Sequence, residues 1–294
     1  MLTPEVLESL DSLIWLGSGH RAAQHCLCSQ SVISRRASLA AGKLGLKLRK
    51  IKDEWDTLPH SHLLSLERRL HQLCRFLKAK RLRLESDHWV GREIIAGLPN
   101  GWSAGRSGRI GIQRPLRLLQ ERVIDAWISS SQPDLPSRDD PAFIAYEIAN
   151  MPLHLASGAK HPLAGEKGLS INDLLRYPSL GLGPDCYPRF GRLLAQQGLW
   201  NDKITMDDYQ FIGWEGRATT GLATVPVNSL STDLSSGPSS SLSVIDWHTG
   251  INDCIALIVR RDLAEEPEFQ HLLEHLRSRA GAMARHNQEL TVLI

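Results

Sequence analysis

The segment LIWLGSGHRAAQHCLCSQSVISRRASLAAGKLGLKLRK, residues 13–50, decides the fold of the first part of this 294-residue chain. It predicts a first helix that ends near Gly17 and a second helix that carries the small pair Ala22 and Ala23. Ser29 is a favourable N-cap for a third helix. Because small residues let two helices cross closely, the segment is typical of a helix-turn-helix motif.

The predicted third helix has two different faces. Its buried stripe recurs at helical spacing and consists of Ile33, Ala37, Ala40 and Leu44. Its opposite face is polar and carries no acidic residue, which suits a groove lined by phosphates. Gly45 should end the helix in the left-handed conformation. Residues 46–52 then alternate apolar and cationic side chains, which indicates a short two-stranded wing.

The side chains of this segment match the two kinds of contact that DNA recognition requires. Gln30 and Arg35 have the reach and donor geometry for adenine and guanine edges, whereas serine hydroxyls can meet bases or phosphates. The helix N-terminus at Ser29 offers backbone N–H groups to a phosphate. The candidate DNA-binding residues are Arg21, Ser29, Gln30, Ser31, Ser34, Arg35, Arg36, Arg49 and Lys50.

Charge and cysteine content limit the class of protein. The net charge is only +2, but the residues up to Arg83 carry +8, from fifteen Lys and Arg against seven Asp and Glu, which leaves −6 for the remainder. A basic head on an acidic body suits a polyanionic partner for the head alone. The alternative is a solvated basic helix face. Five scattered cysteines form no disulfide framework, and Cys26 and Cys28 lack a further ligand pair, so neither disulfides nor a metal is expected.

We expect a cytoplasmic protein that neither crosses nor binds a membrane. The first residues lack the charged-then-apolar pattern of a signal peptide, and no stretch approaches 18 uninterrupted apolar residues. We also expect no enzyme, because the sequence contains no G-x-S-x-G, H-E-x-x-H, P-loop or G-x-G-x-x-G pattern. A cofactor is not expected either.

A long helix is predicted after Pro59. Its leucines step by three and four residues alternately, as in a coiled-coil seam: Leu63, Leu66, Leu70, Leu73 and Leu77. The favoured interpretation is a dimerisation linker, and the alternative is an amphipathic helix packed on its own domain.

From Leu82 onward short apolar strands alternate with helices, which favours α/β units with largely parallel sheets. Strands are predicted at residues 81–85, 108–112, 123–128, 151–156, 179–183, 203–207, 244–247 and 255–260. Helices are predicted at residues 89–98, 115–122, 171–176, 188–198 and 267–282. The fold class is therefore α/β overall, with an all-α winged head and a linker helix in front.

The whole chain resembles the LysR-type transcriptional regulators. The resemblance rests on Gly17-Ser18, Ala22-Ala23, Ser29-Gln30-Ser31, Ser34-Arg35 and Leu44-Gly45, and later on residues 161–164 and 170–175. The chain departs from the family pattern in the wing, where Arg49 and Ile51 replace a phenylalanine and an arginine. Ala40 and Ala41 replace a leucine-glutamate pair. These departures concern wing geometry and the choice of DNA half-site.

The resemblance implies three parts: a winged helix-turn-helix DNA-binding domain at 1–58, a dimerisation linker helix at 59–81, and an effector-binding domain at 82–294. That last domain would resemble a two-lobed periplasmic binding protein, with lobe I at about 82–160 and 255–294 and lobe II at about 161–254. Chain crossings between the lobes are expected near residues 158–161 and 252–258. The implied partners are double-stranded DNA, a second copy in a homodimer or homotetramer, RNA polymerase, and a small-molecule co-inducer.

The candidate effector-binding residues follow the ends of predicted strands, where α/β folds place ligands. They are Ser86, Asp87, His88, Ser129, Ser130, Gly183 and Trp214. Each polar member could instead be a helix cap or turn residue, and Trp214 could be a core residue rather than the floor of a pocket. Two alternative functions remain: a constitutive DNA-binding regulator of the same fold that has lost ligand sensing, and a solute-binding protein.

Overall fold

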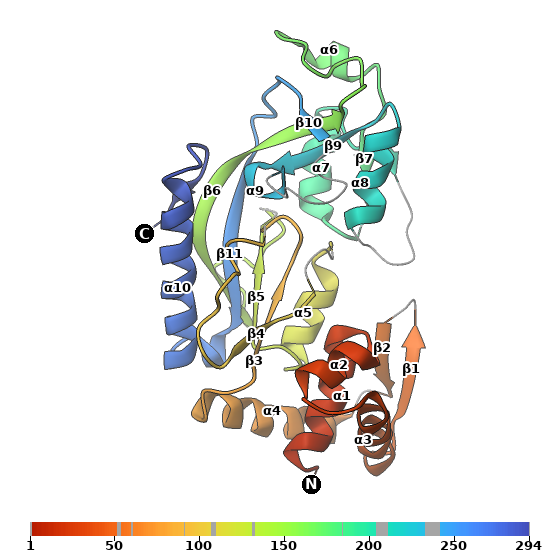
Figure 1. Ribbon diagram of the computed structural model, residues 1–294, viewed down its shortest axis with the longest axis vertical. Helices are drawn as coiled ribbons and strands as arrows, with labels where there is room; N and C mark the ends of the chain where they lie inside the picture. The colour runs from red at the N-terminus through yellow and green to blue at the C-terminus, as the bar shows by residue number, and fades with distance from the viewer. Residues whose placement is uncertain are drawn as a thin grey trace. The chain divides into compact units, whose positions relative to one another are not determined.

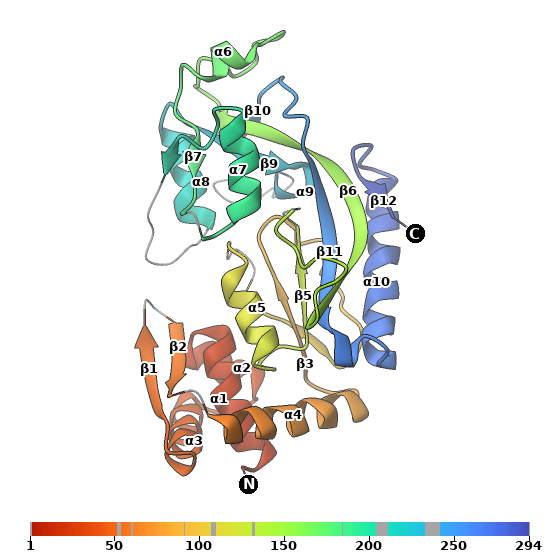
Figure 2. The ribbon, with the colours of Figure 1, turned by 180° about the vertical axis from the view of Figure 1, so that it is seen from behind.

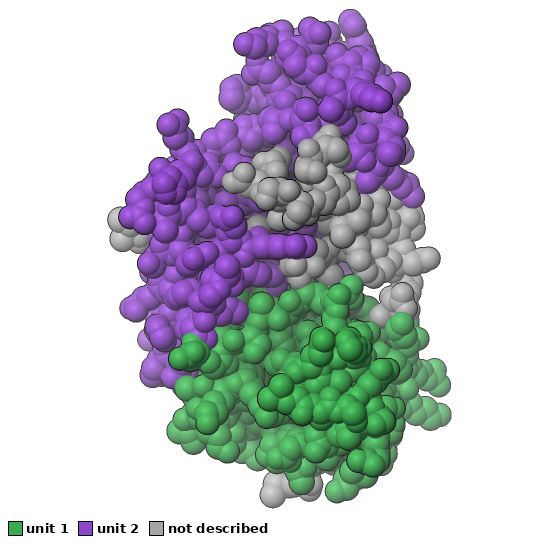
Figure 3. Space-filling model, in the orientation of Figure 1, with its two compact units in different colours: residues 1–85, 100–106, 114–126 green, residues 86–99, 107–113, 127–294 purple. Residues whose placement is uncertain are grey.

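The computed structural model of the chain, seen from two sides in Figure 1 and Figure 2, describes residues 2–51, 54–59, 61–90, 92–106, 110–130, 133–183, 185–203, 211–232 and 242–293. The chain forms two compact units, which Figure 3 distinguishes by colour. Unit 1 contains residues 1–85, 100–106 and 114–126, and unit 2 contains residues 86–99, 107–113 and 127–294. The three-part division drawn from the sequence stays a prediction, because unit 1 combines the N-terminal helices with segments beyond residue 82.

Three helices begin unit 1: α1 (Pro4–Leu16), α2 (Gly19–His25) and α3 (Gln30–Lys43). Thr3 is extended before Pro4, and Gly17, with φ 67°, ends α1 by donating its N–H to the carbonyl of Leu13. The three helices share one small core, whose buried side chains include Leu7, Leu10, Ile14, Ala22, Ala23 and Ile33. The predicted helix-turn-helix arrangement is confirmed.

The third helix and the wing also follow the sequence. The N–H of Val32 donates to Oγ of Ser29 at 3.4 Å, which caps α3. Gly45 has φ +67° directly after the helix, as expected of a left-handed cap. The predicted stripe is buried except for its last, half-buried member: Ile33, Ala37, Ala40 and Leu44. Strands β1 (Lys47–Ile51) and β2 (Glu54–Leu58) then pair antiparallel to form the wing.

Helix α4 (His62–Leu77) has two distinct sides. It begins later than predicted from Pro59, at the cap formed where the N–H of Leu64 donates to Oγ of Ser61. One side is buried within unit 1 and consists of Leu64, Arg68, Gln72 and Phe76. The other side exposes the five leucines of the predicted seam, which keep between 43% and 86% of their surface accessible.

Unit 1 also contains elements from later in the chain. Strand β3 (Leu82–Ser86) pairs parallel with β4 (Trp102–Ala104), with Leu82 opposite Trp102. Helix α5 (Gln113–Gln120) and the turn after it bury Leu118, Leu119 and Val123. The N–H of Asp125 donates to the carbonyl of Arg83 at 2.9 Å, so the chain after α5 joins the side of β3.

The centre of unit 2 is an antiparallel ladder, so the prediction of largely parallel sheets is wrong for this part of the chain. Strand β11 (Asn252–Arg260) pairs with β5 (Ala126–Ser129) and with the first part of the long strand β6 (Phe143–Gly158). From Leu153 onward β6 pairs instead with β9 (Thr224–Asn228) and β10 (Leu242–Val244). The chain therefore changes partners between residues 152 and 153, earlier than the crossing expected at 158–161. Helix α10 (Pro267–Ala284) lies along β6, and the short strand β12 (Thr291–Val292) pairs antiparallel with β6 (Figures 1 and 2).

A second apolar core of unit 2 contains side chains from α6 (Ile171–Leu174), β7 (Leu180–Gly181), α7 (Pro188–Gln196) and α8 (Phe211–Thr220). The remaining elements are β8 (Asp202–Lys203), α9 (Ser229–Thr232) and the 3-10 turn Arg261–Leu263. Three tryptophans meet edge to face in this core: the ring of Trp214 lies 5.8 Å from that of Trp89 and 6.4 Å from that of Trp200.

Two predicted elements are wrong. Residues 92–97 form turns rather than the helix predicted at 89–98, and Gly97 has φ +66°, which a helix does not accept. The strand predicted at 108–112 falls partly outside the described residues, and residues 110–112 are not extended into a strand. Strand β4 stands earlier, at residues 102–104. In the described part of the chain no helix has the length and apolar character needed to span a membrane.

Candidate nucleic-acid interface and buried polar cluster

The outer surface of α3 carries most of the predicted DNA-binding residues. Five of them are exposed: Ser29, Gln30, Ser31, Ser34 and Arg35. Arg36 is half-buried rather than exposed, because it lies at the edge of the face of α3 that packs against the other helices of the head. The side chain of Gln30 lies close to the backbone of Gly19, where an added Cβ would meet the Gln30 Cγ at 3.0 Å. The start of α2 therefore supports the side chain predicted to contact a base.

The other predicted cations lie on neighbouring elements of the head. Arg21 is exposed on α2, and Arg49 and Lys50 are exposed on strand β1 of the wing. The wing also carries two acids on β2, Glu54 and Asp56. Both acids face arginines, as described below, so they are electrostatically compensated within unit 1.

The predicted effector residues give a different result. Three of them meet in one buried cluster at the ends of strands, together with two residues that the sequence reasoning did not select: Asp87, Ser129, Ser130, Asn228 and Asp253. We call these five residues the buried polar cluster. All five belong to unit 2, and none exposes more than 5% of its surface.

The members of the cluster bond to one another. The Ser130 hydroxyl donates to Oδ2 of Asp253 at 2.8 Å, and Nδ2 of Asn228 donates to the same oxygen at 2.9 Å. A further hydrogen bond joins the Ser129 hydroxyl to Oδ2 of Asp87. Burial raises the pKa of Asp87 to about 8; the hydrogen bond from Ser129 opposes this shift, and the nearby charge of Asp253 adds to it. The carboxyl of Asp87 is therefore largely protonated at neutral pH.

The remaining predicted effector residues are not members of this cluster. Ser86 is buried at the end of β3, and Gly183 is half-buried after β7. Trp214 is fully buried between two other tryptophans, as the core interpretation expects, and its role as the floor of a pocket stays a prediction. His88 is half-buried, and burial together with Arg92 lowers its pKa to about 3.

Asn228 and Asp253 were missed for different reasons. Asn228 is the last residue of β9, as Ser129 is the last residue of β5, but no strand was predicted at residues 224–228. Asp253 lies near the start of β11, within the stretch expected to cross between lobes. An acid at the start of a buried strand was the signal that could have selected it.

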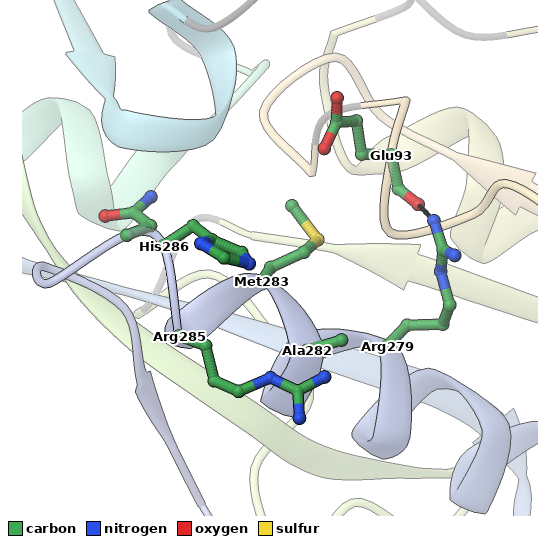
Figure 4. A pocket seen from close by; sticks show the side chains of 7 residues that line it. Glu93, Arg279, Ala282, Met283, Arg285 and His286 are labelled. Carbon is green, nitrogen blue, oxygen red and sulfur yellow. Dashed lines mark hydrogen bonds between the residues drawn. The ribbon is translucent and has the colours of Figure 1, made fainter.

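A shallow hollow of about 300 Å³ lies at the C-terminal end of α10 (Figure 4). It is lined by Glu93, Arg279, Ala282, Met283, Arg285, His286 and Asn287. The guanidinium of Arg279 donates to the backbone carbonyl of Glu93, as the dashed line in Figure 4 shows. None of the predicted effector residues lines this hollow. Among the residues that the structure describes, no three His, Cys, Asp or Glu side chains gather in a way that could hold a metal ion.

A winged helix-turn-helix head followed by a linker helix and a two-lobed α/β domain defines a class of DNA-binding regulators. The family model described as LysR substrate binding domain matches residues 111–281, which is more than half of the chain. The chain therefore belongs to the LysR family, whose members are transcriptional regulators rather than enzymes. This confirms the resemblance and the fold class drawn from the sequence.

Solved structures of similar fold include full-length proteins. The chain superposes with a TM-score of 0.56 and 16% identity on a full-length OxyR variant from Pseudomonas aeruginosa, covering 94% of this chain and 95% of that one. For full-length CbnR complexed with target DNA the TM-score is 0.52 and the identity 16%, with 94% and 99% covered. An H2O2-bound OxyR mutant from Corynebacterium glutamicum gives 0.52 and 13%, with 98% and 96% covered. These likenesses show the fold, and a search of curated protein sequences found no match.

Proposed function

We propose that this protein is a transcriptional regulator that binds specific DNA sequences through α3 and the wing. The observation that carries the proposal is the outer face of α3, which exposes hydroxyl, amide and guanidinium groups on a helix without an acidic residue. Such a face can approach phosphates without repulsion while it offers donors to base edges. The presence of target DNA in the similar CbnR structure supports this function for the shared fold.

The exposed residues divide into two roles. Gln30 and Arg35 reach toward base edges, and Ser31 and Ser34 contact bases or phosphates. Ser29 and the first N–H groups of α3 bind a phosphate. Three cations on the neighbouring elements neutralise further phosphates: Arg21, Arg49 and Lys50. Arg36 contributes long-range charge, because its half-buried position limits its reach.

Selection of bound sequences from random DNA by the full chain tests this function. Arg35→Ala should weaken binding to the selected site by roughly 1–3 kcal/mol and relax the preference at one position. Lys43→Ala is a matched control, because Lys43 is an exposed cation at the other end of α3. Its loss should leave the preference at every position unchanged. A protein that selects no sequence, or an Arg35→Ala variant with an unaltered preference, would contradict the assignment.

We propose further that two copies pair through α4 and that pairs assemble into a homotetramer. The support is the row of exposed leucines at residues 63, 66, 70, 73 and 77, at coiled-coil spacing on a helix whose other side is already buried. This arrangement combines both interpretations drawn from the sequence. The helix packs on its own unit with one side and offers the leucine side to a second copy.

Regulation by a small molecule bound in the two-lobed domain is the favoured proposal, but one observation supports the constitutive alternative. Asp87, Ser129 and Ser130 are buried and already bonded within the polar cluster. A ligand that used them would first have to break these bonds. The solute-binding alternative has no support, because a basic head with an exposed polar helix does not serve that function.

A thermal-shift screen with small acids, sugars and nucleotides separates the two regulators. The full chain is needed, because a fragment that begins at residue 83 would cut through unit 1. A saturable increase in melting temperature that disappears in Ser130→Ala would support ligand sensing through the cluster. Melting that no compound changes would favour the constitutive regulator. A regulator of this kind meets DNA and RNA polymerase in the cytoplasm, which is the location we propose.

A further inference from the structure

Helix α5 connects two parts of the chain that the sequence assigns to different domains. By sequence it lies inside the effector-domain match, which begins at residue 111. By structure, residues 114–126 belong to unit 1, together with the winged head. We propose that α5 is a clamp on the head: Arg114 and Arg117 fix the wing strand β2 and the C-terminal end of α1, so that α5 sets the position of the wing. The inference concerns the head's own geometry and rests on the proposed DNA binding only for its functional consequence.

Arg114 is the centre of the clamp. Its Nη2 atom donates to the backbone carbonyls of Trp15 at 2.6 Å and Ile14 at 3.3 Å, which are unpaired groups of the last turn of α1. A cation at a helix C-terminus also meets the negative end of the helix dipole. The Nε atom lies 2.8 Å from Oε1 of Glu54 on the wing. One side chain therefore touches α1 and β2 at the same time.

Strand β3 fixes the same arginine from a third direction. Nη1 of Arg114 donates to Oε1 of Glu85 at 2.8 Å, and the indole N–H of Trp15 donates to Oε2 of Glu85 at 2.6 Å. Glu85 is 3% exposed and Arg114 is 13% exposed, so water screens this pair only weakly. The two side chains that Glu85 holds together come from α5 and α1.

Gly105 leaves the space that this arrangement requires. A Cβ atom at this position would lie 2.4 Å from Oε2 of Glu85 and 2.7 Å from Nε1 of Trp15. Gly105 is held next to β3 by its own N–H, which donates to the carbonyl of Leu84. Any larger residue there would separate Glu85 from Trp15.

The clamp continues along one face of α5 and the turn that follows it. Positions 114, 117 and 121 follow helical spacing, and the side chains at all three contact the head or α4. Arg117 lies 3.4 Å from a carboxylate oxygen of both Glu54 and Asp56 on β2. Glu121 accepts from Nη1 of Arg68 at 2.9 Å, and Nε of Arg68 donates to Asp11 of α1 at 2.9 Å. The wing, α1 and α4 are thus each tied to α5 by charged side chains.

The clamp explains why acids are tolerated on a DNA-facing wing. Glu54 and Asp56 would repel phosphates if they were uncompensated, yet both lie against arginines of α5. Their charge serves to attach β2, while Arg49 and Lys50 of β1 remain exposed. A displacement of α5 would therefore move the wing and uncover two negative charges beside the proposed DNA surface.

Hydrogen exchange on the full chain tests the clamp without DNA. Arg114→Gln should accelerate amide exchange in β2 and in the last turn of α1 by about tenfold or more, because hydrogen bonds to a charged group are lost. Glu54→Gln removes only the wing attachment, so it should accelerate exchange in β2 alone. Arg192→Gln is the matched control, because Arg192 is exposed on α7 and its Nε bonds to the carbonyl of Pro188 within the same unit. Unchanged exchange in β2 in both Arg114→Gln and Glu54→Gln would overturn the clamp.

The functional consequence has a separate measurement. On the DNA site that the wild-type chain selects, the Arg114→Gln variant should no longer protect the DNA backbone from cleavage where the wing binds. It should still protect the DNA that α3 contacts. Protection that is equal at both ends would overturn the link between α5 and the wing. If the wild-type chain binds no DNA, the proposed function fails, whereas the exchange measurement still decides whether α5 holds the head.

Discussion

Arg75 and Asp125 form a bidentate ion pair in which Nη2 of the arginine lies 2.7 Å from Oδ1 of the aspartate and Nε lies 3.1 Å from Oδ2. Asp125 is fully buried and accepts two further hydrogen bonds, from Nε2 of Gln72 and from the backbone N–H of Arg83. This carboxylate therefore attaches α4 to β3 within unit 1. Helix α4 is therefore an integral part of unit 1 and not a free connector between domains.

Asp125→Ala should strongly destabilise the protein. The change leaves Arg75 and a buried N–H group without their acceptor, and breaking a buried ion pair by removing one partner typically costs about 3–5 kcal/mol. Urea denaturation measures the loss. Asp262→Ala is the control, because Asp262 is 41% exposed beside Arg260 and a surface pair of this kind contributes at most ~1 kcal/mol. Equal losses in the two variants would show that the carboxylate does not hold α4.

Leu70→Glu should prevent pairing of two chains without unfolding either one. Leu70 is 50% exposed in the single chain, so the substitution costs little within unit 1. In a pair of α4 helices the same position would place two carboxylates in the apolar seam, where unpaired charges are unfavourable. Analytical ultracentrifugation should show a lower mass, with an unchanged circular dichroism spectrum. Leu222→Glu, which alters an exposed leucine after α8, should leave the mass unchanged; a loss of mass there as well would mean that exposed leucines in general drive assembly.

The sequence predicted the head well because local signals and tertiary packing agree there. The cap at Ser29, the stripe from Ile33 to Leu44 and the left-handed Gly45 are all determined within a few residues. The leucine seam of α4 was visible for the same reason. What the sequence could not show was the second side of α4, because Arg68 and Gln72 are buried only through partners that lie more than 50 residues away.

In the turns at residues 92–97, by contrast, the local sequence signals and the tertiary packing disagree. Val90 and Ile94 are four residues apart and both buried, as in a helix. The glycines at positions 91 and 97 of the sequence weaken that preference by roughly 1 kcal/mol each relative to alanine, and burial in unit 2 decided the outcome instead.

Three of the five residues of the buried polar cluster were selected from the sequence, because Asp87, Ser129 and Ser130 follow predicted strands. Its closure by Asn228 and Asp253 depends on long-range pairing that no local pattern reveals.

His25 should make the head sensitive to acid. Burial lowers the pKa of His25 to about 4, with smaller contributions from nearby arginines. The unfolded chain takes up this proton near the ordinary pKa of 6.5, so the free energy of unfolding should fall as the pH drops from 6.5 toward 4. His25→Phe keeps a ring against Trp15, 5.2 Å away in the native head, and should reduce that loss. His271→Phe alters an exposed histidine and should leave the loss of stability at acid pH unchanged. Identical pH profiles for the wild type and His25→Phe would show that His25 is not the group responsible.

Asp87→Asn should weaken a pH dependence of the free energy of unfolding that is opposite in sign to that of His25. The unfolded chain releases the Asp87 proton near the ordinary pKa of 3.8, whereas the folded protein keeps it until the pH approaches 8. Folding therefore binds a proton between these values, and the free energy of unfolding should fall as the pH rises through them, by ~1.4 kcal/mol for each unit of pKa difference. Asparagine resembles the protonated acid and should weaken this dependence.

The hydrogen bonds around Asp87 oppose the effect of burial. Oδ2 of Asp87 accepts from the Ser129 hydroxyl and, at 3.3 Å, from the N–H of Ser130, and the N–H of Val90 donates to Oδ1. All three bonds favour the ionised carboxyl, so burial has to outweigh them to raise the pKa. Denaturation series between about pH 5 and pH 8 compare the wild type with Asp87→Asn. A variant that keeps the full wild-type dependence would show that Asp87 is ionised in the fold.

Arg49→Ala should weaken DNA binding without altering which sequence is preferred. Arg49 is exposed on β1, and its register partner on β2 is Asp56, which already lies against Arg117. If Arg49 neutralises one phosphate, its loss should reduce the slope of log affinity against log salt by about one unit. Fluorescence anisotropy between low and physiological salt measures the slope on the selected site and on an unrelated duplex. Equal reductions on both duplexes are expected, because a phosphate contact carries no base information. A reduction confined to the selected site would instead assign Arg49 to base readout, and no reduction at all would remove the wing from the interface.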